Sequence, residues 1–292
     1  MQTKFKTLRS MIESGDLTFL MEAHNGLSAK IVEETGFQGI WASGLSISSA
    51  LGVRDRNEAS WTQILEVVEH MSDITNVPIL MDGDTGFGDF NNVSRLVRKM
   101  CQRHIAGVCI EDKMFPKQNS FLGERQPLIP VEDFNAKIKA AKDAQLDPDF
   151  VFVARLEALI SGHSLQEALD RAHAYREAGA DAILVHSKKS DVSEVAEFCQ
   201  AWTEDCPLVV VPTKYYKTPV NVFRDLGIST VIWANHNMRA AVTAMSDICQ
   251  SIYDSQSLVE AESRVAPLER VFNLSGETEF SAYEKQLFEK SL

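Results

Sequence analysis

Eight short apolar runs recur along the chain, and a segment with helical periodicity follows each of them. The runs cover residues 17–23, 39–43, 77–85, 107–112, 150–157, 182–187, 208–213 and 230–236. Segments between them, such as 61–75 and 164–179, place apolar residues three and four positions apart. Strands that are apolar throughout are typical of a parallel sheet, because both of its faces are covered. The pattern therefore predicts an α/β fold, a (β/α)8 TIM-type barrel rather than a doubly wound sheet.

The chain shows no internal division. No low-complexity linker or break in composition separates parts of the 292 residues, so we expect a single domain. Residues 1–16 predict an additional amphipathic helix, and residues 256–292 predict a helical extension that could cover the barrel or dock on a partner subunit. The N-terminus lacks the apolar core of a signal peptide, and no segment is long enough to span a bilayer. These features favour a cytoplasmic protein.

The charge balance limits the partners of the chain. A formal net charge of -12 argues against general binding to nucleic acid or to an anionic membrane. A small anionic substrate would need a metal ion or local basic groups. The five cysteines are scattered and form no C-x-x-C pair, which is typical of reduced thiols in a cytosolic protein rather than of a zinc or redox site.

Acidic residues follow several of the predicted strands. Asp82 and Asp84 end the third run, Glu111 and Asp112 end the fourth, and Asp55 lies in the loop after the second. In a barrel of this kind the carboxyl ends of the strands meet at one mouth, where the active site lies. Carboxylates crowded there would repel one another unless they shared a cation. Hard oxygen ligands without thiols suit Mg²⁺, so the sequence predicts a magnesium site.

Other interpretations of these acids stay open. The carboxylates could instead cap the following helices or pair with Arg54, Arg56 and Lys113. The closely spaced glycines of "DGDTGFGD", residues 82–89, could also cradle a phosphate group. Their order is not a Walker or dinucleotide fingerprint, and acids flank them on both sides. We interpret this segment as a tight turn that presents its first two aspartates.

Basic residues at later strand ends complete the candidate site. Arg155 and Glu157 end the fifth run, and His186 ends the sixth. Arginine can hold a carboxylate through two parallel hydrogen bonds, which lysine cannot do. His24 and His236 also lie near strand ends and are weaker candidates. No Ser-His-Asp nucleophile elbow or dinucleotide motif is present, so nothing in the sequence calls for an organic cofactor.

Several motifs resemble one known superfamily. The segments "DGDTGFG" (82–88), "EDK-x-FPK" (111–117) and "VARLEA" (153–158) follow in order the motifs of the isocitrate lyase and phosphoenolpyruvate mutase superfamily. The similarity covers almost the whole chain. Within the superfamily, the branch that forms carbon–phosphorus bonds is matched by "GLSISSALGVRDRNEASWTQ", "EDKMFPKQNS", "ILVHSKKSD", "VPTKYYKTP" and "VIWANHNMRA".

This resemblance implies an activity and an assembly. It implies a Mg²⁺-dependent interconversion of phosphoenolpyruvate and 3-phosphonopyruvate, an isomerase reaction of phosphonate biosynthesis in which a phosphoryl group moves from oxygen to carbon. It also implies a barrel whose eighth helix swaps between subunits, so that dimers pair into a homotetramer.

The resemblance also implies roles for particular residues. Asp82 would ligate Mg²⁺ directly, with Asp84, Glu111 and Asp55 reaching the ion through water, and Asp55 would face the phosphorus. The substrate-binding residues would be Trp41, Ser43, Gly44, Leu45 and Ser120. The catalytic residues would be Asp55, Arg155, His186, Lys117 and Asn119, of which the last two share a gating loop with Ser120.

Three alternatives to this activity differ in testable ways. The lyase branch places a Cys-Gly-His triplet after "FPK", where this chain has Gln118, Asn119 and Ser120. Phosphonopyruvate hydrolase shares the acids but tends to carry threonine in place of the asparagine, and it lacks the run "TKYYKTP". Asn119 and residues 214–219 therefore favour the carbon–phosphorus branch over hydrolysis. A non-catalytic barrel, whose acids hold a structural cation, would turn over neither compound.

Overall fold

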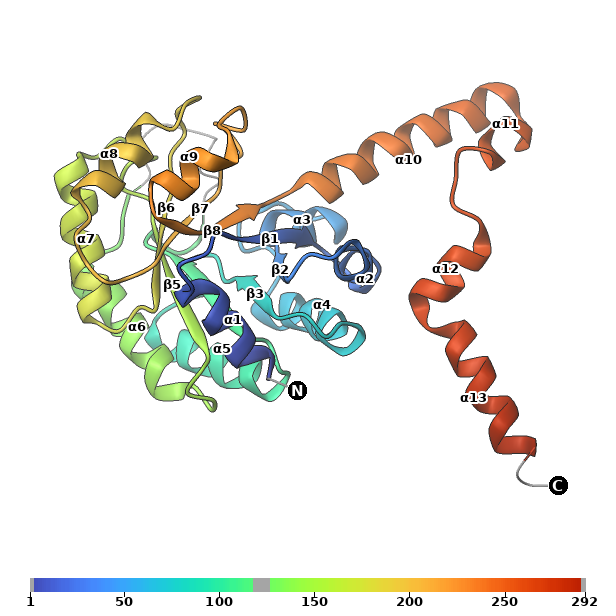
Figure 1. Ribbon diagram of the computed structural model, residues 1–292, viewed down its shortest axis with the longest axis horizontal. Coiled ribbons are helices and arrows are strands. Elements are labelled where there is room, and N and C mark those ends of the chain that lie inside the picture. Colours follow the sequence, from blue (N-terminus) through green and yellow to red (C-terminus); the bar gives the residue numbers. More distant parts are fainter. Residues whose placement is uncertain (1–2, 118–126, 290–292) are drawn as a thin grey trace. The chain divides into compact units, whose positions relative to one another are not determined.

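Eight parallel strands form the centre of the molecule. The computed structural model describes residues 3–117 and 127–289, and its strands close into a barrel in chain order, with helices around the outside (Figure 1). The strands are β1 Thr18–Ala23, β2 Gly39–Ala42, β3 Ile79–Asp82, β4 Gly107–Glu111, β5 Val151–Leu156, β6 Ala182–Val185, β7 Leu208–Val210 and β8 Ile228–Trp233. The predicted (β/α)8 barrel and its strands are confirmed.

The strands end earlier than the apolar runs suggested. The third run extended to residue 85, whereas β3 ends at Asp82, and the seventh extended to residue 213, whereas β7 ends at Val210. At β3 the reason is local, because Asp84 has a φ of 48° and a strand cannot continue through a left-handed residue. The residues beyond these ends form the loops above the barrel.

Helices follow the strands as the periodicity predicted. The helices of the first part of the chain are α1 Lys4–Glu13, α2 Gly26–Thr35, α3 Gly44–Ala50, α4 Trp61–Ile74, α5 Phe90–Gln102, α6 Val131–Ala144, α7 Leu165–Glu177, α8 Ser193–Ala201 and α9 Val220–Asp225. Ser164 caps α7 by accepting a hydrogen bond from the Glu167 N–H (3.1 Å). Such a cap satisfies one of the backbone donors that a helix start leaves without a partner.

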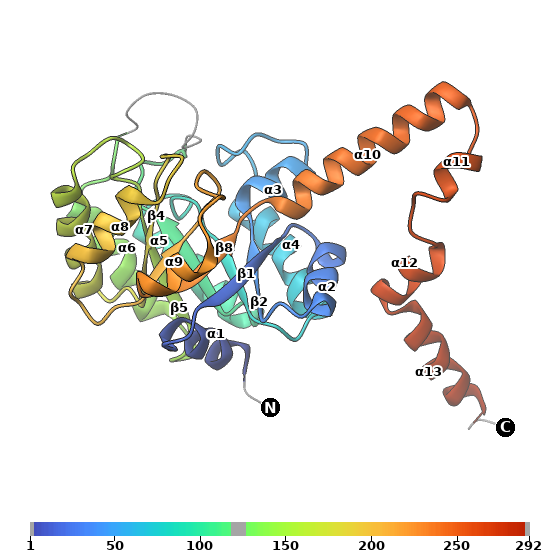
Figure 2. The same cartoon turned by 45° about the horizontal axis from the view of Figure 1, so that its top comes forward.

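The additional N-terminal helix closes the amino end of the barrel. In α1 the side chains of Phe5, Leu8, Met11 and Ile12 are buried, and Figure 2 shows the helix at the lower end of the barrel. A Cβ atom at Gly107, the first residue of β4, would lie 2.9 Å from Leu8 Cδ2. Glycine at this strand start therefore lets the helix approach closely.

The described chain separates into two compact units, residues 1–235 and 236–292. The second unit contains α10 His236–Ser255, α11 Val259–Glu262, α12 Leu268–Ser275 and α13 Glu277–Glu289. The sequence predicted a single domain with a helical extension that begins at residue 256, and this domain organisation stays a prediction. None of the helices in the described ranges combines the length and apolar character that crossing a membrane requires. All five cysteines lie in the described residues as free thiols.

Candidate active site

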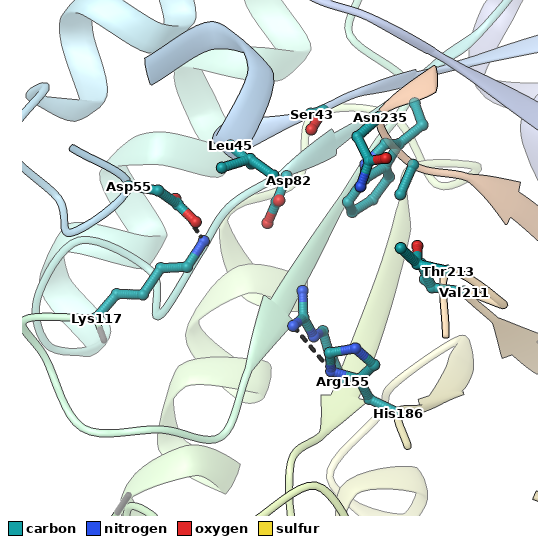
Figure 3. Close-up of a pocket in the computed structure, with 12 residues that line it drawn as sticks. Ser43, Leu45, Asp55, Asp82, Lys117, Arg155, His186, Val211, Thr213 and Asn235 are labelled. Carbon is teal, nitrogen blue, oxygen red and sulfur yellow. Dashed lines mark hydrogen bonds and ion pairs between the residues drawn. The ribbon is translucent and has the colours of Figure 1, made fainter. Parts of the chain in front are cut away.

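A small cavity lies at the carboxyl ends of the strands. Its volume is about 70 Å³, which suits a ligand of few atoms. Figure 3 shows side chains that line it. Residues predicted from the sequence line most of it, namely Trp41, Ser43, Leu45, Asp55, Asp82, Lys117, Arg155 and His186. They come from several strands and the segments that follow them. The sequence therefore predicted correctly which strand ends meet.

The register of the strands explains why these residues meet. Asp82, the last residue of β3, pairs with Cys109 of β4, and Glu111 pairs with Arg155 of β5. Side chains alternate between the two faces of a strand, so Cys109 and Glu111 lie on the same face. The acidic ends of β3 and β4 and the arginine of β5 are thus brought to one mouth.

Lys117 joins two of the predicted acids. Its Nζ lies 2.8 Å from Asp55 Oδ1 and 2.5 Å from Asp84 Oδ1. Asn57 also links Asp84 to Lys117. Its side-chain amide donates to Asp84 Oδ2 (2.8 Å), and its side-chain oxygen accepts from the Lys117 backbone N–H (2.6 Å). Asp55 and Asp84 therefore pair with Lys117 rather than with a neighbouring arginine, while Arg54 pairs with Glu58 (2.5 Å).

Burial governs the charges of this cluster. It raises the pKa of the Asp84 carboxyl to about 7, although the ammonium of Lys117 opposes the shift. Burial alone would lower the pKa of Lys117, but the carboxylates of Asp84 and Asp82 raise it well above its ordinary value. The lysine is thus a cation held among anions, and each of its partners depends on it for compensation.

The backbone of the segment after β2 approaches Asp82 and Asp84, two of the acids that the sequence predicted as metal ligands. The Gly44 N–H donates to Asp82 Oδ2 at 3.2 Å. A Cβ atom at Gly44 would lie 3.1 Å from that oxygen and 3.0 Å from Asp84 Oδ1, so a larger residue would press on both carboxylates. The Ser43 hydroxyl accepts from the Ser46 N–H (3.3 Å) and caps α3. In this structure Gly44 therefore supports the site from behind, while Trp41, Ser43 and Leu45 line it.

Arg155 and His186 form the opposite wall, and Glu157 links them. Glu157 Oε1 lies 2.6 Å from Arg155 Nε and 2.6 Å from His186 Nδ1. Burial alone would raise the pKa of the Glu157 carboxyl, but Arg155 and His186 hold it well below its usual range. Burial lowers the pKa of the His186 imidazole, so this ring is neutral near pH 7.

The two acids at the end of β4 have different environments. Within the described residues, neither carboxylate oxygen of Glu111 has a hydrogen-bond partner, although Arg155 Nη2 lies 3.2 Å from Glu111 Oε2. Burial raises the pKa of Glu111. Asp112 faces α7, where its Oδ2 accepts from the Tyr175 hydroxyl (2.8 Å). The expectation that Asp112 shares the mouth is therefore wrong, because adjacent strand residues point to opposite faces.

The donors at the mouth fit a hard cation. Across residues 3–117 and 127–289, no three His, Cys, Asp or Glu side chains gather closely enough to hold a metal ion among themselves. The acids of the mouth are nevertheless all oxygen donors, and Mg²⁺ usually takes one or two carboxylates and completes its shell with water. The buried carboxylate of Glu111, with no hydrogen-bond partner in the described part of the chain, is the group that such a shell would satisfy.

Sequence reasoning missed part of the site and proposed residues beyond it. Val211, Thr213, Ala234 and Asn235 also line the cavity. They follow β7 and β8, and the same strand-end rule that found Asp82 would have found them. Conversely, His24 pairs with Glu22 (2.7 Å) and does not line the cavity, nor does His236. The predicted residues Asn119 and Ser120 lie outside the described residues.

Comparison with known proteins places this geometry in a family. The sequence model described as "Phosphoenolpyruvate phosphomutase" matches residues 8–253. A protein of that name from Tetrahymena pyriformis is 58% identical over 97% of this chain and 95% of its own. The crystal structure of phosphoenolpyruvate phosphomutase from Streptomyces platensis subsp. rosaceus superposes with a TM-score of 0.94, at 42% identity over 97% of this chain and 98% of that one. A phosphonopyruvate hydrolase structure, in complex with oxalate and Mg²⁺, superposes with a TM-score of 0.92, at 37% identity over 97% and 99% of the two chains.

Proposed function

The chain belongs to the phosphoenolpyruvate phosphomutase family, and we propose that it interconverts phosphoenolpyruvate and phosphonopyruvate. The observation that carries this proposal is the meeting of Asp55, Lys117, Arg155 and His186 around one small cavity. Two cations there would bind the phosphoryl and carboxylate groups of a small anion. The aspartate stands at the same cavity, where it can face the phosphorus.

The reaction needs positioning more than proton transfer. In phosphoenolpyruvate the bond from phosphorus to the enol oxygen breaks and a bond from phosphorus to the methylene carbon forms, while the enol oxygen becomes the ketone of phosphonopyruvate. No proton is gained or lost. Catalysis of such a transfer comes from neutralising charge, aligning the groups and excluding water. A neutral His186 and a firmly charged Arg155 suit that task.

Mg²⁺ fits the donors of the mouth. We propose that Asp82 holds the ion directly, and that Asp84, Glu111 and Asp55 hold it through water. When bound, the ion would neutralise substrate oxygens and polarise the carbonyl group. Lys117 would then be the residue whose partners change, since it shares Asp55 and Asp84 with the ion. Its ammonium can turn from these carboxylates to the transferring phosphoryl group.

Hydrolysis of phosphonopyruvate is the competing activity, because a hydrolase shares this fold. The two reactions differ in whether water reaches the phosphoryl group. We propose that Asn119 and residues 214–219 favour retention of the phosphoryl group. Within that second segment the Tyr215 side chain is fully buried, and Thr213 just before it lines the cavity.

Phosphorus NMR of the purified protein tests the proposal. With Mg²⁺ and phosphonopyruvate, we expect the phosphonate signal to be replaced by that of phosphoenolpyruvate. Inorganic phosphate and pyruvate as the first products would identify a hydrolase instead. An unchanged phosphonate signal would leave a non-catalytic barrel. A parallel sample with a chelator in place of Mg²⁺ is expected to stay unreacted.

We also propose that the chain assembles as a homotetramer of helix-exchanged dimers in the cytoplasm. All 20 residues of α10 are described, and none of them is buried within the single chain. Val242 and Met245 on this helix are more than half exposed, so their apolar side chains are available to pack against a partner subunit. Light scattering on the eluting protein should give four times the mass of one chain. A monomer would contradict the proposal.

A further inference from the structure

Glu157 is a buried carboxylate that contacts two residues of the cavity wall without itself lining the cavity. It is fully buried at the end of β5, two positions after Arg155. Its Oε1 lies 2.6 Å from both Arg155 Nε and His186 Nδ1, and its Oε2 lies 2.7 Å from Lys113 Nζ. Residues of β5, β6 and the segment after β4 thus converge on one carboxylate.

We propose that Glu157 is a positioning residue that fixes the plane of the Arg155 guanidinium and the tautomer of the His186 ring. This proposal rests on the proposed phosphomutase reaction only where activity is measured. Two groups approach His186 Nδ1, namely Glu157 Oε1 at 2.6 Å and Arg155 Nη2 at 3.0 Å. An ionised carboxylate can only accept hydrogen bonds, so the shorter contact places the proton on Nδ1, and the guanidinium then lies beside this nitrogen without donating to it. The other ring nitrogen, Nε2, then carries a lone pair in the neutral ring.

The contact with Arg155 fixes which edge of the guanidinium meets the substrate. Because Nε is held by Glu157, Nη2 lies between Glu111 Oε2 (3.2 Å) and His186 Nδ1 (3.0 Å), and the side chain lines the cavity. A guanidinium binds an anion best when two parallel N–H groups face it, so its orientation decides its affinity. Glu111, at 3.2 Å from Arg155 Nη2, and Asp82 also attract this guanidinium, and without Glu157 they would draw it toward the acids that we propose hold the metal.

Glu157 is itself held from the outer face of the barrel. Its backbone N–H donates to Asp112 Oδ1 (2.8 Å), and Asp112 Oδ2 accepts from the Tyr175 hydroxyl (2.8 Å) and Arg171 Nη1 (3.3 Å) of α7. This network anchors the backbone of Glu157, whereas its carboxylate serves the site. The contacts of the Glu157 backbone and those of its carboxylate can therefore be removed separately. This allows a purely structural role of Glu157 to be distinguished from a positioning role.

The tautomer can be read without any turnover. We would label the histidines with ¹⁵N, assign the His186 signals with His186→Asn, and record the spectrum near pH 7.5. The expected ring is neutral with its proton on Nδ1. A neutral ring protonated only on Nε2 would overturn the proposal, whether or not the protein is a phosphomutase and whether or not any Glu157 variant folds.

Kinetics then separate positioning from stability. In Glu157→Gln we expect kcat/KM to fall about 10- to 100-fold with a raised KM, as is typical when an orienting partner is lost. The His186 signals should shift toward the Nε2–H tautomer. Glu157→Asp keeps the charge and should recover the Nδ1–H tautomer and part of the lost kcat/KM.

Tyr175→Phe is the matched control. It removes a buried hydrogen bond to Asp112 in the same network but leaves the carboxylate of Glu157 in place. We expect a lower stability with unchanged KM and unchanged His186 signals. If Glu157→Gln behaves like this control, losing only stability, Glu157 is a structural residue and the proposal fails.

Discussion

The two ends of the barrel bury different kinds of side chain, apolar at the amino end and charged at the carboxyl end. At the amino end, α1 presents Leu8 and Ile12, which are 0% and 1% exposed and pack against the strand starts. At the carboxyl end, charged groups such as Lys113, Lys117 and Glu111 are almost as deeply buried. Apolar burial stabilises a fold, whereas buried charges at best offset the cost of their own desolvation. The difference indicates that the amino end maintains the fold and the carboxyl end performs the chemistry.

The largest effect is expected from Asp55→Ala at the carboxyl end. Because we propose that Asp55 faces the phosphoryl group, its loss should lower kcat/KM at least 1,000-fold, about 4 kcal/mol of transition-state stabilisation. The thermal midpoint should change little, since Asp55 is one of several like charges and itself raises the pKa of Asp84. Steady-state kinetics and calorimetry on the same preparation measure both quantities.

Glu58→Ala provides the control for that variant. It removes an acid from the same loop, where Glu58 pairs with Arg54 and does not line the cavity. We expect nearly wild-type turnover. Turnover of Asp55→Ala within threefold of the wild type would remove Asp55 from the mechanism.

The next effect concerns the amino end. Leu8→Ala deletes a fully buried side chain between α1 and β4 and should lower the free energy of unfolding by about 2–4 kcal/mol. Chemical denaturation measures this loss, and kcat/KM per folded molecule should be unchanged. Leu146→Ala, at a leucine that is 52% exposed, should cost far less. A drop in kcat/KM in Leu8→Ala, with the protein fully folded, would show that the two ends are not independent.

The sequence predicted the two ends unequally well. At the amino end, helical periodicity was sufficient to predict α1, because burial of apolar residues follows directly from their spacing. At the carboxyl end, the strand-end rule placed Asp82, Arg155 and His186 correctly. It could not assign the pairing of Asp84 with Lys117, which depends on the positive φ of Asp84 in a turn. A two-residue period would have separated Glu111 from Asp112, but the strand-end rule treats both alike.

The smallest expected effect is a pH dependence confined to the carboxyl end. Lys137 of α6 is 2% exposed, and its Nζ donates to the backbone carbonyl of Thr85 (2.7 Å) in the loop after Asp84. Burial lowers the pKa of this ammonium to about 8. Below that pH the ammonium is charged in both the folded and the unfolded chain, so the full desolvation cost of burying it opposes folding. Above it the folded chain releases the proton before the unfolded chain does, so stability rises with pH up to the ordinary lysine pKa.

Comparison with Lys137→Met isolates this contribution. Between pH 7 and pH 9.5 the unfolding free energy of the wild type should rise by about 1–2 kcal/mol relative to the variant, because each unit of a pKa difference is worth 1.36 kcal/mol. Denaturation at both pH values measures the difference, and titrations common to both proteins cancel. Leu8→Ala should show no such dependence on pH, since apolar burial carries no proton. A constant difference between the wild type and Lys137→Met would mean that Lys137 stays charged in the fold at alkaline pH, as Lys117 does.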